Sequence, residues 1–375
     1  MRKKFGNIAC FFVDLLGKLK NIIRLLFIFF NLLYNRFGEI WMANKNSNLH
    51  QAKRLKDDEF YTTYETIEKE ISHYVEQFKN KTILCNCDNP YYSNFSKFFI
   101  QNFNALSLKR LIITSINSES FENPFSFDDG NRTSSNGLIL DISKVDSSLD
   151  FSDFINKTNS VKELEGNGDF RSEECIRYLL ESDIIVTNPP FSLFKEMVSI
   201  IMKYNKKFLI IGNQNALTYK EIFPLIQQNI VWTGYQFGEM KFRVPQNSEP
   251  RATRYWVDED GQKWRSLGNA MWLTNLDNER RHENLKLTHC FNPTIHQTYD
   301  NYDAIHIRNI SEIPYDYTGI MAVPITIINR LNSEQFEIIG EANHGSDNNF
   351  DIFKPILNGK EVFKRILIRN KVVVL

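Results

Sequence analysis

The most constraining feature of the chain is a short apolar run that stops on two prolines. It reads Ser182-Asp183-Ile184-Ile185-Val186-Thr187-Asn188-Pro189-Pro190-Phe191. Proline cannot donate to a sheet ladder and pushes the residue before it out of the helical region, so a strand is predicted to end near Thr187. Phe194, Met197, Val198 and Ile201 then follow at helical spacing. The unit is strand, stiff loop, helix, and ligands of open α/β sheets bind at the carboxyl ends of strands.

The loop from Asn188 to Phe191 carries groups that suit a planar exocyclic amine. The Asn188 side-chain oxygen and the Pro189 carbonyl can each accept one amine hydrogen, which favours a pyramidal nitrogen with its lone pair aimed at an incoming methyl group. Phe191 would lie against the face of the base, where stacking is worth ~1–3 kcal/mol. Asn-Pro dipeptides also mark ordinary turns, so an inert strand-ending turn is the alternative interpretation.

Several other pieces of sequence narrow the interpretation. Asn188-Pro189-Pro190-Phe191 resembles motif IV of amino-directed methyltransferases in its adenine-directed DNA form. The other pieces are Asp57-Asp58-Glu59-Phe60-Tyr61-Thr62, Cys85-Asn86-Cys87-Asp88, Gly168-Asp169-Phe170-Arg171-Ser172 and Thr218-Tyr219-Lys220-Glu221. Together, and in this order from about Met42 to the end, they resemble the EcoRI-type adenine-N6 DNA methyltransferases of restriction–modification systems.

This resemblance implies an α/β fold, a Rossmann-like S-adenosylmethionine-dependent methyltransferase sheet with an appended, mostly-β target-recognition region. It implies transfer of a methyl group from S-adenosyl-L-methionine to adenine N6 at specific sites in double-stranded DNA. The target base would be flipped out of the duplex. A cognate restriction endonuclease acting on the same site, without direct contact, is an expected counterpart, and no metal is needed.

The resemblance also assigns residues. Asn188, Pro189, Pro190 and Phe191 would be catalytic, and the donor would be held by Phe60, Tyr61, Thr62, Asp88, Asp169 and Phe170. Each of these residues also has a simpler structural interpretation. An aromatic residue before a helix often only packs against its first turn, and Asp88 could be an ordinary turn residue. No glycine occurs between Gly38 and Gly130, which excludes a standard Gly-rich dinucleotide loop after the first strand.

The pattern of apolar residues predicts a catalytic domain over 59–240. Helices are predicted over 64–78, 93–103, from 171 and over 219–227. Strands are predicted over 82–87, 109–115, 137–142, 208–211, 231–233, 271–276, 319–329, 335–340 and 363–368. A mostly polar stretch follows the strand over 137–142, up to residue 160, and we interpret this region as an elaboration of the sheet.

A segment rich in arginine and aromatic residues follows. Asp260-Gly261 predicts a hairpin that places Tyr255-Trp256 opposite Lys263-Trp264. Interleaved cations and aromatics suit phosphate contact and stacking, so contact with DNA is expected from four arginines: Arg243, Arg251, Arg254 and Arg265. Four acidic residues lie among them, so a solvated hairpin is the alternative. We expect a recognition region over 241–345 and a basic strand or tail over 346–375.

The N-terminal segment differs from the rest in charge. Residues 1–41 hold seven Lys/Arg against two acids, which is +5, and the chain as a whole is neutral, which leaves −5 for 42–375. Its apolar runs are shorter than the ~20 residues of a spanning helix. Translation from Met42, followed by a polar arm over 42–58, is the expectation, with an interfacial helix as the alternative. Five scattered cysteines indicate a reducing compartment, the cytoplasm, rather than a disulfide framework.

Two other functions remain open. An RNA or protein-glutamine N-methyltransferase is possible because Asn-Pro-Pro-aromatic loops serve all planar amines. A catalytically silent DNA-binding relative is the third. Phe191 and the resemblance across the chain favour DNA over the first alternative, and the intact loop argues against the second.

Overall fold

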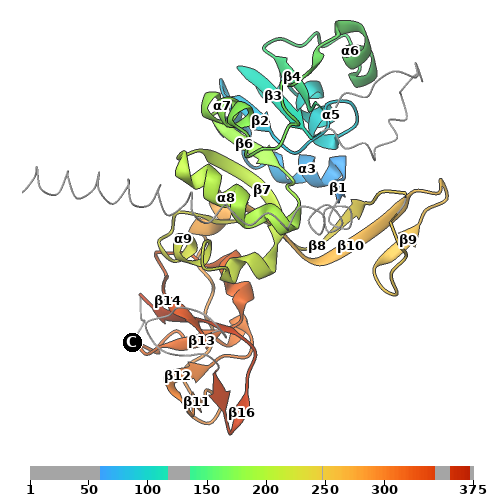
Figure 1. Cartoon of the computed structure of the whole chain (residues 1–375). Helices are drawn as coiled ribbons and strands as arrows, with labels where there is room; N and C mark the ends of the chain where they lie inside the picture. The colour runs from blue at the N-terminus through green and yellow to red at the C-terminus, as the bar shows by residue number, and fades with distance from the viewer. Residues whose placement is uncertain (1–59, 117–135, 247, 343–354, 372–375) are drawn as a thin grey trace, which may run out of the picture. The chain divides into compact units, whose positions relative to one another are not determined.

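The computed structural model describes residues 60–116, 136–246, 248–342 and 355–371 (Figure 1). The expectations for the segments 1–41 and 42–58 lie outside these residues. Within them, no helix is both long and apolar enough to cross a bilayer.

Four parallel strands form the centre of a ten-stranded sheet, in the order β3-β2-β6-β7. They are β2 (Thr82–Cys85), β3 (Arg110–Ser115), β6 (Ile184–Thr187) and β7 (Lys207–Asn213). The chain passes from β2 to β3 on one side, whereas β6 lies on the other. The carboxyl ends of β2 and β6 therefore form a topological switch point, where α/β sheets bind ligands.

Antiparallel strands extend both edges of this sheet. On one edge are β4 (Leu138–Ile142) and β5 (Val161–Glu163). On the other are β10 (Lys263–Thr274), β8 (Trp232–Arg243) and β1 (Tyr61–Thr62), and β9 (Tyr255–Val257) pairs with the far part of β10. The mixed α/β sheet agrees with the predicted fold class. The domain boundary predicted at residue 240 falls inside β8.

Helices cover both faces of the sheet, which explains why its central strands are continuously apolar. On one face, α3 (Tyr64–Ile71), α5 (Asn94–Gln101) and α6 (Phe151–Thr158) share a core with alternate strand residues such as Ile83 and Cys85. On the other, α7 (Glu173–Glu181) packs on β2 and α8 (Phe194–Lys203) on β7. The predicted face of α8 is confirmed, because Phe194, Met197, Val198 and Ile201 are buried.

A second sheet of five strands follows in the chain, in the order β11-β12-β13-β17-β14. These strands are β11 (Thr298–Tyr299), β12 (Tyr302–His306), β13 (Met321–Val323), β17 (Arg365–Asn370) and β14 (Phe336–Ala342). A small hairpin, β15 (Ile356–Leu357) with β16 (Lys360–Glu361), precedes β17. Because β17 lies between β13 and β14, the predicted C-terminal strand belongs to the same sheet as residues 298–342.

Two predictions of local structure were wrong in part. The helix predicted over 64–78 is broken into α3 and α4 (Val75–Phe78), because the Ser72 N–H closes the last turn of α3. The strand predicted over 319–329 ends at Val323, since Pro324 removes a ladder donor and starts the 3₁₀ segment η5 (Ile325–Arg330). The polar stretch contains α6, whose first turn is capped by the Asp150 carboxylate.

The remaining irregular elements are short. They are α9 (Phe223–Gln227), which has Pro224 in its first turn, and the 3₁₀ segments η1 (Phe191–Leu193), η2 (Gln214–Thr218), η3 (Glu279–His282) and η4 (Ile310–Glu312). The helix predicted over 219–227 is thus shortened by its proline, as the sequence indicates.

Candidate active site

The loop after β6 presents one oxygen without a partner. β6 ends at Thr187, as predicted. The Asn188 Nδ2 donates to the Phe60 backbone oxygen at 2.5 Å. The Asn188 Oδ1 is buried and accepts no hydrogen bond from any described residue. Because the amide nitrogen is held by Phe60, the oxygen is the free end of the amide, which is what acceptance of an amine hydrogen requires.

Phe60 and Phe191 form the aromatic part of the site. Their ring centroids lie 5.3 Å apart with planes inclined by 21°, so they are stacked. The edge of Phe242, from β8, meets Phe60 at 5.5 Å. The structure therefore brings Phe60, which the sequence assigns to the donor, directly against the predicted catalytic loop. Phe191 is half-buried, whereas Phe60 is buried.

Asp88 lies at the switch point itself. Its two carboxylate oxygens accept hydrogen bonds from the Thr187 Oγ1 at 2.7 Å and the Ser93 Oγ at 2.8 Å. Burial raises the pKa of the Asp88 carboxyl to about 7, although the two hydroxyls act to lower it. Ser93 also caps α5. Thr187 and Ser93 were missed by the sequence interpretation. The position of Thr187 at the end of its strand was the available signal.

Further buried polar atoms lack partners at the same end of the sheet. Within the described part of the chain, no hydrogen bond reaches the Thr62 Oγ1, the Asn86 Oδ1 or the Ser115 Oγ. These atoms follow or lie in β1, β2 and β3. Native proteins rarely leave such groups unsatisfied, so their concentration here indicates a polar ligand. With the buried Asp88 carboxyl, which a cation would satisfy, this donor set fits S-adenosylmethionine, a ligand with an ammonium group, a ribose and a base.

Asp169 and Phe170 lie in the predicted turn before α7. Gly168 has φ +81° there, and a Cβ on it would stand 2.2 Å from the Ser115 oxygen, so the close backbone approach expected of this glycine is present. The Asp169 carboxylate is bonded by the Arg171 guanidinium at 2.7 and 2.9 Å. Burial raises the pKa of Asp169, but its hydrogen bonds and the charge of Arg171 lower it on balance. Phe170 is buried.

The charges of Asp88 and Asp169 both act on the pKa of one thiol, that of Cys87. Burial raises the pKa of Cys87 well above its ordinary value, and both of these carboxylates raise it further. Arg171, which occupies the Asp169 carboxylate, is a residue that the sequence interpretation did not single out.

The four arginines predicted to contact DNA do not share one environment. Arg243 is exposed and donates to the Gln262 Oε1 at 2.5 Å, and Arg251 is exposed. The Arg254 guanidinium lies over Gly268, where a Cβ would meet its Nη1 at 2.0 Å. The Arg265 guanidinium carbon lies 4.9 Å from the centre of the Phe60 ring. This ring is the one that stacks on Phe191 of the predicted catalytic loop.

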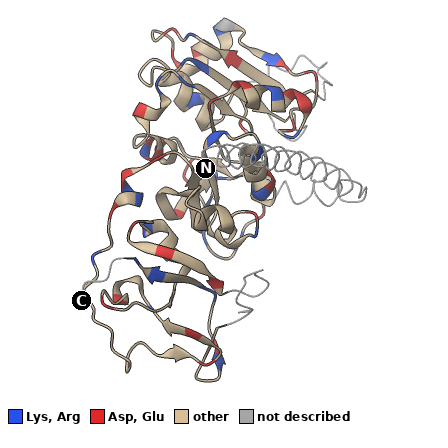
Figure 2. Ribbon diagram, turned by 90° about the vertical axis from the view of Figure 1, so that its left-hand side faces the viewer, with Lys and Arg blue, Asp and Glu red and all other residues tan. Residues whose placement is uncertain are grey.

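The predicted hairpin is confirmed. Trp256 pairs with Trp264 across β9 and β10, and their indoles are stacked with centroids 6.2 Å apart. Gly261, at φ +76°, lies in the turn between these strands. Basic and acidic residues are interspersed over the described elements rather than gathered on one of them (Figure 2).

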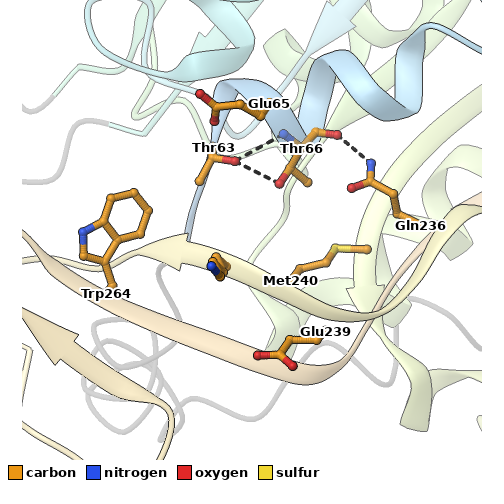
Figure 3. Close-up of a pocket in the computed structure, with 8 residues that line it drawn as sticks. Thr63, Glu65, Thr66, Gln236, Glu239, Met240 and Trp264 are labelled. Carbon is orange, nitrogen blue, oxygen red and sulfur yellow. Dashed lines mark hydrogen bonds between the residues drawn. The ribbon is translucent and has the colours of Figure 1, made fainter. Parts of the chain in front are cut away.

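A groove of about 410 Å³ lies beside the start of α3, between that helix and the strands β8 and β10 (Figure 3). Its lining consists of Thr63, Glu65, Thr66, Gln236, Glu239, Met240, Lys241 and Trp264. It contains none of the residues predicted to be catalytic. Two carboxylates against one lysine do not favour an anionic ligand there, so we assign it no role. Among the described residues, no three His, Cys, Asp or Glu side chains are grouped as metal ligands, and the four described cysteines are free.

A mixed sheet with a polar and aromatic Asn-Pro-Pro-Phe loop at its switch point defines a methyltransferase-like site. Comparison with known proteins identifies the family. The model of the adenine-specific methyltransferase EcoRI family matches residues 48–371. The chain belongs to this family, and the resemblance seen in the motifs is confirmed. It is a site-specific DNA adenine methyltransferase by membership of that family.

Individual relatives show the extent of the similarity. The Type II methyltransferase M.EcoRI of Escherichia coli is 43% identical over 333 residues, which cover 87% of this chain and 97% of that protein. The Type II methyltransferases M.MgeORF184P of Mycoplasma genitalium and M.MpnI of Mycoplasma pneumoniae are 36% and 35% identical, over 78% and 77% of this chain and 85% and 84% of their own lengths. No solved structure shows significant similarity to the chain.

Proposed function

We propose that the protein transfers a methyl group from S-adenosyl-L-methionine to the N6 atom of an adenine that is flipped out of double-stranded DNA. The observation that carries this proposal is the Asn188 Oδ1, buried and without a partner among the described residues, on the same loop as Phe191. An acceptor and an aromatic face on one stiff loop are what an exocyclic amine on a planar base requires.

In this proposal, Asn188 and the Pro189 carbonyl accept the two amine hydrogens, while Pro190 keeps the loop stiff. Phe191 supports the base, and stacking of this kind contributes ~1–3 kcal/mol. The donor supplies an electrophilic methyl group. Catalysis then depends mainly on alignment of the amine with that methyl group, which can contribute ~7–11 kcal/mol to lowering the barrier.

The donor is proposed to lie across the carboxyl ends of β1, β2 and β3. Asp88 would hold its ammonium group, and the Thr62, Asn86 and Ser115 side chains would satisfy its other polar groups. Tyr61, with Phe60, would border its methionine end. Asp169 and Phe170 would border its adenine, with Arg171 fixing the orientation of the carboxylate.

DNA recognition is proposed for the chain beyond Arg243, with the hairpin arm β9–β10 and the five-stranded sheet as its main parts. The exposed Arg243 and Arg251 would contact phosphates there. A restriction endonuclease with the same target would be the biological counterpart, because methylation at N6 would protect the shared site.

The direct test is methylation of a mixed DNA substrate with S-adenosyl-L-methionine, followed by sequencing with detection of modified bases. N6-methyladenine at one short sequence is expected. The variant Asn188→Ala should lower the single-turnover rate by ~100-fold or more, as loss of a positioned hydrogen-bond partner does in other enzymes. Its donor affinity, measured by calorimetry, should not change.

Near wild-type turnover by Asn188→Ala would contradict the mechanism. Methylation of RNA or of a protein glutamine, with DNA untouched, would replace the proposed substrate. Donor binding without transfer to any substrate would indicate a catalytically silent relative.

A further inference from the structure

The antiparallel strand pair β8–β10 presents two rows of side chains, one on each face. Residues directly opposite each other on antiparallel strands point to the same face. The register pairs Thr62 with Phe242, Phe242 with Arg265, and Arg265 with Tyr255. These four side chains, from β1, β8, β10 and β9, therefore form one row, which we call the inner row.

The neighbouring row points the other way, since successive residues of a strand alternate between faces. It contains Arg243 and Trp264, which pair with each other. Lys241 and Ser266 form the next pair, and they also lie on this outer face. The cations of the strand pair β8–β10 are thus divided between its two faces.

The inner row faces the catalytic loop. Phe242 is buried against the edge of the Phe60 ring, and the Arg265 guanidinium lies over the same ring at 4.9 Å. Phe60 in turn stacks on Phe191 and holds the Asn188 amide. Phe60 is therefore in contact with both the Arg265 guanidinium and the Phe191 ring.

Two hydroxyls of the inner row lack partners. Among the residues that the structure describes, none bonds the Thr62 Oγ1 or the Tyr255 Oη, although both atoms are buried. Thr62 is only 4% exposed. Because Thr62 is assigned to the methyl donor in the proposed function, the Arg265 guanidinium and the Tyr255 hydroxyl are the pair on this face that matches an oxyanion, to which Arg and hydroxyl groups donate hydrogen bonds.

We propose that Arg265, with Tyr255, binds the phosphodiester of the flipped adenosine nucleotide and so positions the target base at Asn188. This inference rests on the proposed function. A nucleotide whose base lies on Phe191 carries its phosphate away from the amine, and the inner row is the surface that contacts Phe60, the ring stacked on Phe191. Arg265 is a positioning residue. The anionic alternative is the carboxylate of the methyl donor, and the test separates the two.

The test compares Arg265→Ala and Arg265→Lys with Lys241→Ala, which removes a cation from the outer face of the same strand pair, β8–β10. With the recognition sequence known from the methylation experiment, 2-aminopurine replaces the target adenine, and its fluorescence reports flipping. Arg265→Ala should reduce the fluorescence rise and lower the single-turnover rate at saturating DNA about 10- to 100-fold. Arg265→Lys should recover part of the rate, and Lys241→Ala should leave both signals unchanged.

Donor affinity, measured by calorimetry, should be the same in wild type and Arg265→Ala. A loss of donor affinity in Arg265→Ala with normal flipping would assign the guanidinium to the donor carboxylate and overturn the proposal. Equal behaviour of Arg265→Ala and Lys241→Ala would overturn it as well. Arg265→Met, which keeps the apolar stem over Phe60, separates loss of charge from loss of folding. Absence of methylation by the wild type would instead contradict the proposed function.

Discussion

Asp88 is a buried carboxyl at the switch point, and within the described residues it accepts hydrogen bonds from neutral groups. Its hydrogen-bond partners, Thr187 and Ser93, are neutral hydroxyls, and burial brings its pKa to about 7. The charged form is therefore disfavoured until a cation arrives. The ammonium group of the proposed donor would supply that cation and favour the ionised carboxylate.

The variant Asp88→Asn tests this state in the donor-free protein. Because the pKa of Asp88 is raised on folding, to about 7, the folded form holds the proton more tightly than the unfolded chain. Stability is therefore lost as pH rises from about 4 to about 7 and does not change further above that. Between pH 5 and pH 8, wild type should lose about 2–3 kcal/mol relative to Asp88→Asn in urea unfolding. A difference between the two proteins that does not vary with pH would show that Asp88 is already ionised.

At the scale of elements, the junction between α3 and β8 is built on a buried glutamate. Glu70 is fully buried and accepts hydrogen bonds from the Tyr235 and Gln236 backbone N–H groups at 2.7 and 2.8 Å, and from the Tyr74 hydroxyl at 3.2 Å. Burial raises the pKa of Glu70, while these bonds act to lower it. The contact fixes the start of β8 on the helix that follows Phe60.

Gly234→Ala should disturb this junction. A Cβ at Gly234 would stand 2.1 Å from the Glu70 Oε1 and 2.8 Å from the Trp272 Cβ, and neither group can move freely. We expect a loss of about 1–3 kcal/mol in stability, the usual cost of overpacking. Gly166→Ala is the matched control, because its nearest neighbour is the end of the Glu174 side chain at 3.5 Å. Equal stability of both variants would mean that α3 shifts to make room for the alanine side chain at position 234.

The sequence was sufficient for elements whose signals are local. β6 and its Asn-Pro-Pro end, the helix that starts near residue 171, and the Trp256–Trp264 pair were predicted from prolines, helical spacing and a turn. β8 was predicted over only 231–233. Its pattern is interrupted by Gly234, which makes room for Glu70, and by Gly238 at φ +118°, opposite a β-bulge in β10.

The candidate site was predictable in its residue types but not in its contacts. The place of Asn188 followed from the motif. The hydrogen bond from its amide to Phe60, and the position of Arg265 over that same ring, depend on the register of β1, β8 and β10. Register over distant segments is a tertiary property, and no local pattern in either segment encodes it.

For the molecule as a whole, charge limits how DNA can be held. Residues 42–375 carry a net charge of −5, because the chain is neutral and residues 1–41 carry +5. A diffuse positive field is therefore absent from the family-like region, and phosphate contacts must be local. Figure 2 agrees with this, since acidic residues accompany basic ones on the described elements.

The double variant Arg243→Ala/Arg251→Ala should consequently have a measurable salt signature. Each phosphate contact contributes about −0.9 to the slope of log K against log salt, so the slope should flatten by about 2. Lys157→Ala on α6, which removes an exposed lysine paired with Asp153, should leave the slope unchanged. An unaltered slope in the double variant, on target and non-target DNA alike, would remove these two arginines from the interface.

The Phe60 residue has a consequence for the order in which the enzyme takes its two substrates. One residue carries the amide contact of Asn188, the ring contact of Phe191 and the guanidinium contact of Arg265, and it is followed directly by the donor motif. Any change that donor binding makes in the position of Phe60 would therefore also act at the proposed site of the base and its nucleotide. By reciprocity, any change that the donor makes in DNA affinity must be matched by the same factor in the effect of DNA on donor affinity. Under the proposed function, donor and DNA binding would then be coupled through Phe60, and the coupling would appear equally in the two affinities.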